Sequence, residues 1–109
     1  MANKVSIHFK EERIDRATYI AKTVGFGKIV QAAHYYRQDG KYTVHTITET
    51  GVIILYGTNN KIITMFIARP EQVIALYKKN EWGKVPNWLM NKVNKNWKKG
   101  YTQNQPDYK

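Results

Sequence analysis

Hydrophobic residues change their spacing within the N-terminal third of the chain. From Val5 to Phe9 they alternate with polar residues, which predicts a short β-strand. From Lys10 to Val24 they recur at spacings of three and four, which predicts an amphipathic helix that ends at Gly25. The segment Lys28 to Arg37, with apolar residues at positions 29, 30 and 33, predicts a second helix.

The middle of the chain is rich in the residue types that favour β-strands. Val, Ile, Thr and Tyr predict three strands, at Lys41–Thr48, Val52–Tyr56 and Lys61–Ala68. Turn residues separate these segments: Asp39-Gly40 before the first, Glu49-Thr50-Gly51 as a hairpin loop, and Gly57 to Asn60 before the third. Because short loops join antiparallel neighbours, the three strands are expected to form an antiparallel meander.

Tight hairpins also predict a strand register. Placing Thr48 opposite Val52 sets His45 opposite Leu55, and placing Tyr56 opposite Lys61 sets Leu55 opposite Ile62. One face then carries Val44, Thr46, Thr48, Val52, Ile54, Tyr56, Ile63, Met65 and Ile67, and the other carries Thr43, His45, Ile47, Ile53, Leu55, Ile62, Thr64 and Phe66. Both faces are largely apolar, so we expect each to be covered at least in part, although a one-residue slip would exchange the two sets.

Two further helices are predicted after the strands. Pro70 opens a helix from Glu71 to about Lys79, and Pro86 with Asn87 starts another through Lys99, which Gly100 ends. The predicted fold is therefore α+β, with a three- to four-stranded antiparallel meander sheet, two N-terminal helices and two C-terminal helices. Residues 1–100 are expected to form a single domain, and the polar residues 101–109 a flexible tail.

Composition adds a strong positive charge to this picture. Among 109 residues, 18 are Lys or Arg and 8 are Asp or Glu, which gives a formal net charge of +10 and favours a polyanionic partner. The chain contains no cysteine, so disulfides, thiol catalysis and thiolate metal sites are excluded. Without a long apolar run or an apolar N-terminal segment, we expect no membrane contact and a cytoplasmic protein.

Lysines alternate with aromatic residues in the C-terminal third. Lysines neutralise phosphates and exposed aromatic rings stack on bases, so this pattern predicts nucleic-acid binding, with RNA favoured over DNA. The candidate binding residues are Lys78, Lys79, Lys84, Lys92, Lys95, Lys98, Lys99 and Tyr101. Leu89, Val93 and Trp97 are spaced to pack on the protein body, which directs the lysines of this helix elsewhere. The alternative is a solvated lysine surface with tryptophans in the core.

The histidines do not have the spacing of a metal site, so neither a metal nor another cofactor is predicted. RNA cleavage without metal needs a base, an acid and a cation near the scissile phosphate. His45 in mid-strand, Arg69 at a strand end and Tyr42 at a strand start are the candidate catalytic residues. The alternative is structural: a histidine among apolar neighbours, an arginine that closes a strand, and a tyrosine between core and solvent.

The order of two helices, the meander from Tyr42 to Ala68 and then basic helices resembles the small RelE-like and barnase-like proteins, and the segment Tyr42 to Ile54 looks like the strand–turn–strand of such folds. Ile63 to Pro70 is also similar to short proteins of phages and prophages of low-GC Gram-positive bacteria, which implies a location in the cytoplasm of a bacterial host cell. The resemblance extends over residues 8–80 and implies a metal-independent ribonuclease, or an inactive relative, of the kind common in toxin–antitoxin systems. RelE-like toxins carry several basic residues on the sheet and a terminal tyrosine, whereas here Arg69 and Lys61 alone are near that surface.

Two functions from different classes follow. The first is an RNA-binding protein of phage or mobile-element origin, with metal-independent endoribonuclease activity as a further hypothesis. The second is a non-enzymatic phage protein that inhibits or modulates a host nuclease or regulator. A basic inhibitor would show the same charge, so composition does not separate the two.

Overall fold

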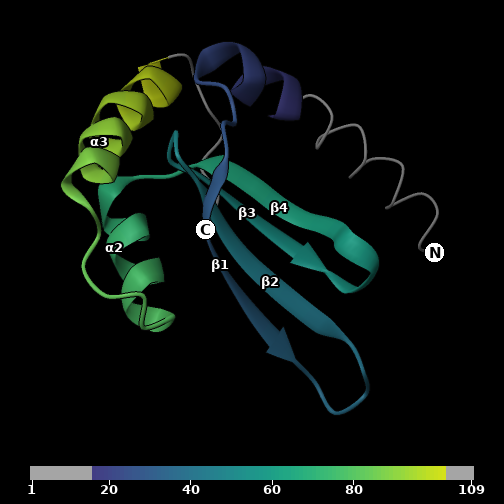
Figure 1. Cartoon of the computed structure of the whole chain (residues 1–109). Coiled ribbons are helices and arrows are strands. Elements are labelled where there is room, and N and C mark those ends of the chain that lie inside the picture. The colour runs from purple at the N-terminus through teal and green to yellow at the C-terminus, as the bar shows by residue number, and fades with distance from the viewer. Residues whose placement is uncertain (1–15, 103–109) are drawn as a thin grey trace.

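A four-stranded antiparallel sheet forms the centre of the computed structural model, which describes residues 16–102 (Figure 1). The strands follow one another in space in the order β1-β2-β3-β4, so the sheet is a meander. Helix 16–23 precedes the sheet, and two helices follow it. The elements are β1 (Ile29–Tyr36), β2 (Tyr42–Thr48), β3 (Val52–Gly57), the single 3-10 turn η1 (Thr58–Asn60), β4 (Lys61–Ile67), α2 (Pro70–Lys79) and α3 (Asn87–Thr102).

The sheet has a hydrophobic cluster on each face, as the alternation of its strands predicted. On one face Ile47 and Ile53 pack with residues of α2 and α3, which lie together to one side of the sheet in Figure 1. On the other face Val52, Ile54 and Met65 pack with Ile20 of helix 16–23. Because adjacent residues of a strand point to opposite sides, neighbours such as Val52 and Ile53 belong to different clusters.

The predicted helix at residues 28–37 is wrong, because this segment is strand β1. Its backbone pairs with β2 from Ile29 opposite Thr48 to Tyr36 opposite Tyr42, and the Arg37 N–H donates to the Lys41 carbonyl across the Asp39-Gly40 turn. β-Branched and aromatic residues at both ends favour a pleated surface, so pairing with β2 outweighs a weak helical spacing. The described residues therefore contain three α-helices, and the expected strand at residues 5–9 lies outside them.

The last helix is longer than predicted. Gly100 was expected to end it, but α3 continues to Thr102. A glycine inside a helix costs about 1 kcal/mol relative to alanine, and this cost does not by itself stop a helix. The residues beyond Thr102, to which the predicted flexible tail largely belongs, lie outside the described part of the chain.

The predicted register is confirmed for one hairpin and wrong for the other. His45 pairs with Leu55 and Thr46 with Ile54, as expected. Between β3 and β4, however, Gly57 rather than Tyr56 pairs with Lys61, and a β-bulge between Leu55 and Tyr56 then sets Leu55 opposite Thr64 rather than Ile62. Because Ile62 lies opposite Tyr56, it packs against the Ile20 cluster, and Ile63 is exposed, opposite to the predicted assignment of these two residues.

The hairpin loop between β2 and β3 positions α3 on the sheet. Gly51 has a φ of +87°, the positive value that the sequence predicted, and a Cβ added there would lie 2.9 Å from Cγ2 of Val93. The Asn96 side-chain amide donates to the Thr50 carbonyl at 2.9 Å, while the Thr50 hydroxyl donates to the carbonyls of Gly25 and Phe26. This loop thus joins α3 to the segment after helix 16–23. These contacts fix the position of α3 on the sheet.

Candidate nucleic-acid interface

Helix α3 has one buried side and one exposed side. It begins after Pro86, whose carbonyl accepts hydrogen bonds from the N–H groups of Leu89 and Met90, both at 3.0 Å. Leu89 and Val93 are fully buried against the sheet and α2, as their spacing predicted. The side chains on the opposite side of the helix project into solvent.

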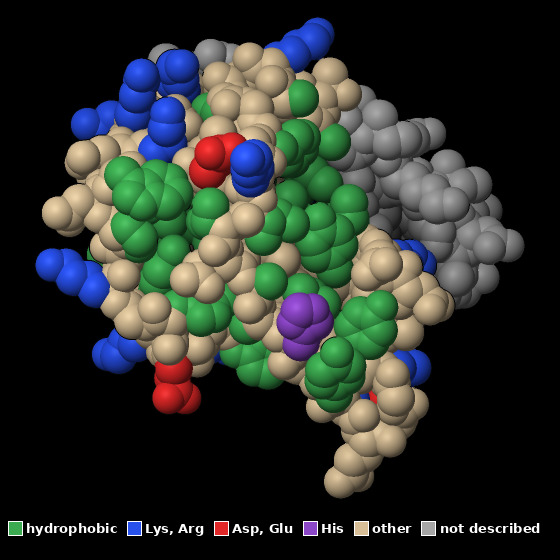
Figure 2. All heavy atoms as spheres, in the orientation of Figure 1, with side chains coloured by type: hydrophobic (Ala, Val, Ile, Leu, Met, Phe, Trp, Pro, Cys, Tyr) green, Lys and Arg blue, Asp and Glu red, His purple; other side chains and the backbone are tan. Residues whose placement is uncertain are grey.

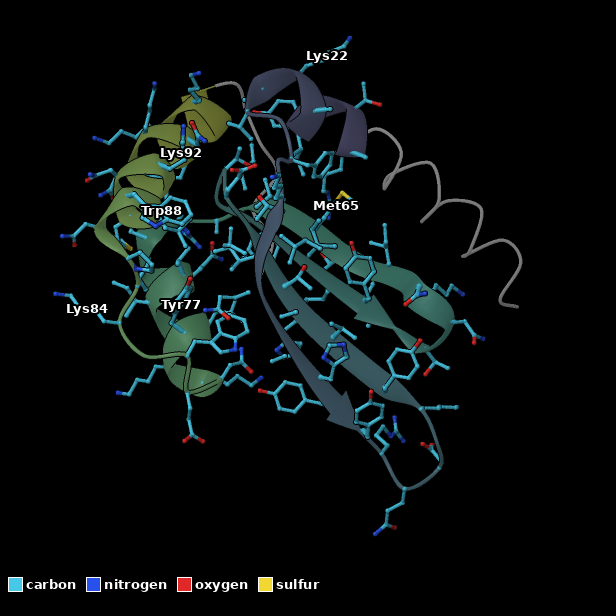
Figure 3. The ribbon with its side chains drawn as sticks, in the orientation of Figure 1. Lys22, Met65, Tyr77, Lys84, Trp88 and Lys92 are labelled. Carbon is cyan, nitrogen blue, oxygen red and sulfur yellow. The ribbon has the colours of Figure 1, made fainter. Side chains whose placement is uncertain are left out.

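The exposed side of α3 carries a lysine face, which we define as Trp88, Lys92, Lys95, Lys98 and Lys99. Trp88, Lys92, Lys95 and Lys99 are spaced by four, three and four residues, so they lie along one stripe of the helix. Trp88 is 52% exposed and lies one turn before Lys92 (Figure 3). The segment Asn87–Thr102 contains no acidic residue, so no carboxylate of this helix offsets the positive charge.

Figure 2 shows the basic side chains of this region gathered at the upper left, over the C-terminal half of α3. Lys98 and Lys99 lie near the C-terminal end of the helix, where cations also interact favourably with the helix dipole. Trp88 lies toward the N-terminal end, beyond Lys92 (Figure 3). The lysine face therefore presents an aromatic ring at one end and a concentration of positive charge at the other.

The remaining predicted binding residues lie elsewhere. Lys78 and Lys79 are exposed at the end of α2, and Lys84 is exposed in the loop that leads to α3, from which it extends outward (Figure 3). Tyr101 lies in the last turn of α3, and its side chain is outside the described part of the structure. The structure thus brings four of the predicted lysines together on α3 and places three others nearer α2.

The two tryptophans of α3 have different environments. Trp97 is half-buried and packs against the cluster that contains Ile20 and Met65, as predicted for a core residue. Trp88 projects into solvent and was not among the predicted binding residues. The spacing of Trp88 to Lys92, Lys95 and Lys99 is the signal that places this ring among the lysines.

His45 lies in a shallow groove between the sheet and α2. The groove has a volume of about 410 Å³, and its walls include Leu55, Phe66 and Leu76, with Lys79 at its edge. The Tyr35 ring lies 4.8 Å from the imidazole between ring centres, and the Tyr35 hydroxyl donates to the Asn80 side chain. Nδ1 of His45 is buried and has no hydrogen-bond partner among the described residues. These surroundings are mainly apolar.

The structure does not bring the three candidate catalytic residues together. His45 pairs with Leu55, and Leu55 pairs with Thr64 on β4. Arg69 is five residues after Thr64, and five residues of extended chain span on the order of 15 Å. Tyr42 is three residues from His45 on the same strand, so the two side chains point to opposite faces of the sheet.

Arg69 and Tyr42 both have structural contacts. Arg69 precedes α2, where its backbone N–H donates to the Gln72 side chain at 2.8 Å and its guanidinium lies 3.9 Å from Glu71. The Tyr42 hydroxyl accepts the N–H of Asn59 at 3.0 Å, and its backbone N–H donates to the Thr58 hydroxyl. Tyr42 therefore holds the turn between β3 and β4, while Arg69 begins a helix.

The environment of His45 makes stability depend on pH. Burial, and secondarily the positive charge of Lys79, lower the pKa of His45 from its ordinary value of 6.5. Below pH 6.5 the unfolded chain then binds a proton at this position before the folded protein does, so the free energy of unfolding falls as the pH is lowered. We expect His45→Gln to reduce this fall in urea titrations between about pH 7.5 and 5.5, the range in which histidine titrates.

His34 supplies the matched control for this measurement, because it is exposed on β1. His34→Gln removes a histidine that does not line the groove beside α2. An equal reduction in both variants would show that the environment of His45 has no particular effect.

Among residues 16–102, no three His, Cys, Asp or Glu side chains are grouped so as to hold a metal ion. The helices in that range include none with the length and hydrophobicity needed to cross a membrane. Comparisons with protein-family models, with curated proteins and with solved structures found no match to the chain. The functional interpretation therefore depends on the geometry of the surface itself.

Proposed function

We propose that this protein binds single-stranded nucleic acid, with RNA as the preferred strand, through the lysine face of α3. The observation that carries the proposal is the alignment of Trp88, Lys92, Lys95 and Lys99 along the exposed side of a helix whose other side is anchored in the core. Lys92 and Lys99 are about 10 Å apart along the helix axis, at 1.5 Å per residue. A strand that follows this stripe places several phosphates within reach of the ammonium groups.

Trp88 favours a single strand over a duplex as the ligand. Its exposed ring offers a flat apolar surface on which a base stacks, and bases are accessible for such stacking when they are unpaired. Exposing a tryptophan to water is unfavourable in the free protein, so covering it contributes to binding. Stacking at one end and charge along the stripe are the two elements that sequence-independent single-strand binders combine.

The proposal is binding rather than cleavage. Tyr42 and His45 point to opposite faces of the sheet, and Arg69 lies beyond the end of β4. The three residues therefore do not form a site around one phosphate. Inactive relatives occur in the RelE-like group that the strands resemble, so that resemblance is compatible with binding alone. An origin in a phage or mobile element stays a prediction from the sequence.

A protein partner is the second candidate function, and strand β1 favours it. Among residues 16–102, β1 is an edge strand of the sheet, and its eight residues, IVQAAHYY, include no charged residue or proline to discourage pairing with another strand. Its outer edge could accept an extended segment of a host nuclease or regulator by β-strand addition. Co-purification in which Ala32→Pro removes a bound protein and leaves nucleic-acid binding intact would support this second function.

The test of the first function is a titration of a fluorescently labelled unstructured RNA strand at low salt, followed by fluorescence anisotropy. We expect saturable binding that an unlabelled single strand displaces more readily than an unlabelled duplex of the same length, because only the single strand offers bases to Trp88. If the single strand does not bind at low salt, the proposal is wrong. If duplex and single strand compete equally, the role of Trp88 is wrong.

A further inference from the structure

A second surface feature lies where α2 meets α3. It is a pocket of about 560 Å³ between the end of α2, the connecting loop and the first turn of α3. Its walls are apolar, from Ile74, Tyr77, Val85 and Met90, and Lys78 and Lys84 contribute to its rim. The volume lies within the range of roughly 300–1,000 Å³ that is typical of small-ligand sites.

The walls of the pocket are held in place by the fold. Tyr77 is buried, and its ring meets the Trp82 ring edge to face with 5.2 Å between their centres. The backbone N–H of Trp82 donates to the backbone carbonyl of Tyr77 at 3.0 Å. Gly83 has a φ of +86°, which allows the chain to turn sharply back toward α3. Since Tyr77 and Val85 are both core residues, the pocket does not need to form upon binding.

One apolar wall of the pocket, the side chain of Ile74, is exposed to solvent. Ile74 is 52% exposed although it is an isoleucine on an ordered helix. Around it the rim carries two lysines and one carboxylate, that of Glu81, so its charge is positive by one. An apolar pocket with a cationic rim is complementary to a ligand that has a flat apolar part and an anionic part next to it.

We infer that this pocket takes one unstacked base of the bound single strand, while Lys78 and Lys84 contact the phosphates on either side of it. This inference depends on the proposed function and specifies how the strand is held. The pocket includes Asn87, the first residue of α3 and the neighbour of Trp88, so a strand that leaves the lysine face at Trp88 reaches the pocket next. A base is a planar aromatic group with a phosphate close by, which matches both parts of the site.

The test compares two strands and two variants. The strands are an oligouridylate and an abasic strand of the same length, which keeps the phosphates and lacks the bases. Ile74→Gln removes an apolar wall of the pocket, and Ile63→Gln is its matched control, because Ile63 is 45% exposed on β4 and does not line the pocket. Thermal melts of both variants establish that these exposed substitutions leave the fold intact.

We expect Ile74→Gln to weaken oligouridylate binding about fivefold, because a base that enters the pocket covers the exposed apolar surface of Ile74. Its affinity for the abasic strand should stay unchanged, and Ile63→Gln should bind both strands like the unmodified protein. Equal behaviour of the two variants toward oligouridylate would overturn the pocket inference, while salt-dependent binding of both strands would leave the proposed function standing. If the protein binds neither strand, the pocket inference and the proposed function are both wrong.

Discussion

Replacing Lys92, Lys95, Lys98 and Lys99 together with glutamine should flatten the dependence of log K on log salt concentration by about 2–3 units. Each phosphate contact on a single strand contributes a slope of about −0.7, so the loss of four contacts removes nearly 3 units. All four side chains are exposed on α3, and glutamine favours helices about as well as lysine, so the fold should be retained. Anisotropy titrations at several salt concentrations measure the slope.

The chain offers a control with the same change in charge. Lys22, Lys28, Lys41 and Lys61 are also exposed, but they lie in helix 16–23, in the segment before β1, before β2 and at the start of β4. Replacing these four with glutamine lowers the net charge equally and should leave the slope nearly unchanged. If both variants flatten the slope equally, binding follows the total charge of the protein rather than the lysine face.

The tryptophans of α3 should respond in opposite ways to substitution by alanine. Trp97→Ala is expected to cost about 3 kcal/mol of unfolding free energy, the low end of the range for buried aromatic truncations, because Trp97 is half-buried against the Ile20 cluster. Trp88→Ala should change stability by less than about 0.5 kcal/mol, as is usual for exposed positions. It should instead weaken strand binding by about 1–3 kcal/mol, the energy of base stacking.

Urea unfolding and strand titration on the same two variants separate these effects. Each tryptophan serves as the control for the other, since both substitutions remove the same group from the same helix. A large loss of stability in Trp88→Ala, or binding unchanged by it, would contradict the assignment of Trp88 to the lysine face.

Local signals sufficed to predict much of the fold. Pro70 with its helix, the Glu49-Thr50-Gly51 loop and the pairing of His45 with Leu55 are all confirmed. In each case the signal is short-range: a proline at the first helical position, a glycine with positive φ, or strands joined by a tight loop. Such features depend little on what the rest of the chain does.

The errors arise where distant residues decide the structure. β1 is a strand because it pairs with β2, and its spacing of Ile29, Val30 and Ala33 is compatible with a helix until that pairing is known. The bulge between Leu55 and Tyr56 shifts the register of β4, and no turn residue marks it. Gly100 was a plausible helix end, but it lies inside α3.

The candidate interface was predictable in part. The periodicity of Leu89, Val93 and Trp97 predicted the buried side of α3, and hence that its lysines are exposed. The apolar pocket was not predictable, because it needs α2 and α3 to be placed side by side. The candidate catalytic residues were selected by type, and residue type carries no information about which face of a strand or which end of the sheet each occupies.

The single strand is expected to lie along the exposed side of α3. The most direct measurement is a titration of ¹⁵N-labelled protein with an unstructured RNA strand, followed by NMR of the backbone amides and the tryptophan indoles. We predict that the Trp88 indole and the amides from Trp88 to Lys99 shift most, while those of the Asp39-Gly40 turn stay in place. Shifts concentrated on β1 or around His45, with α3 unaffected, would contradict binding through the lysine face.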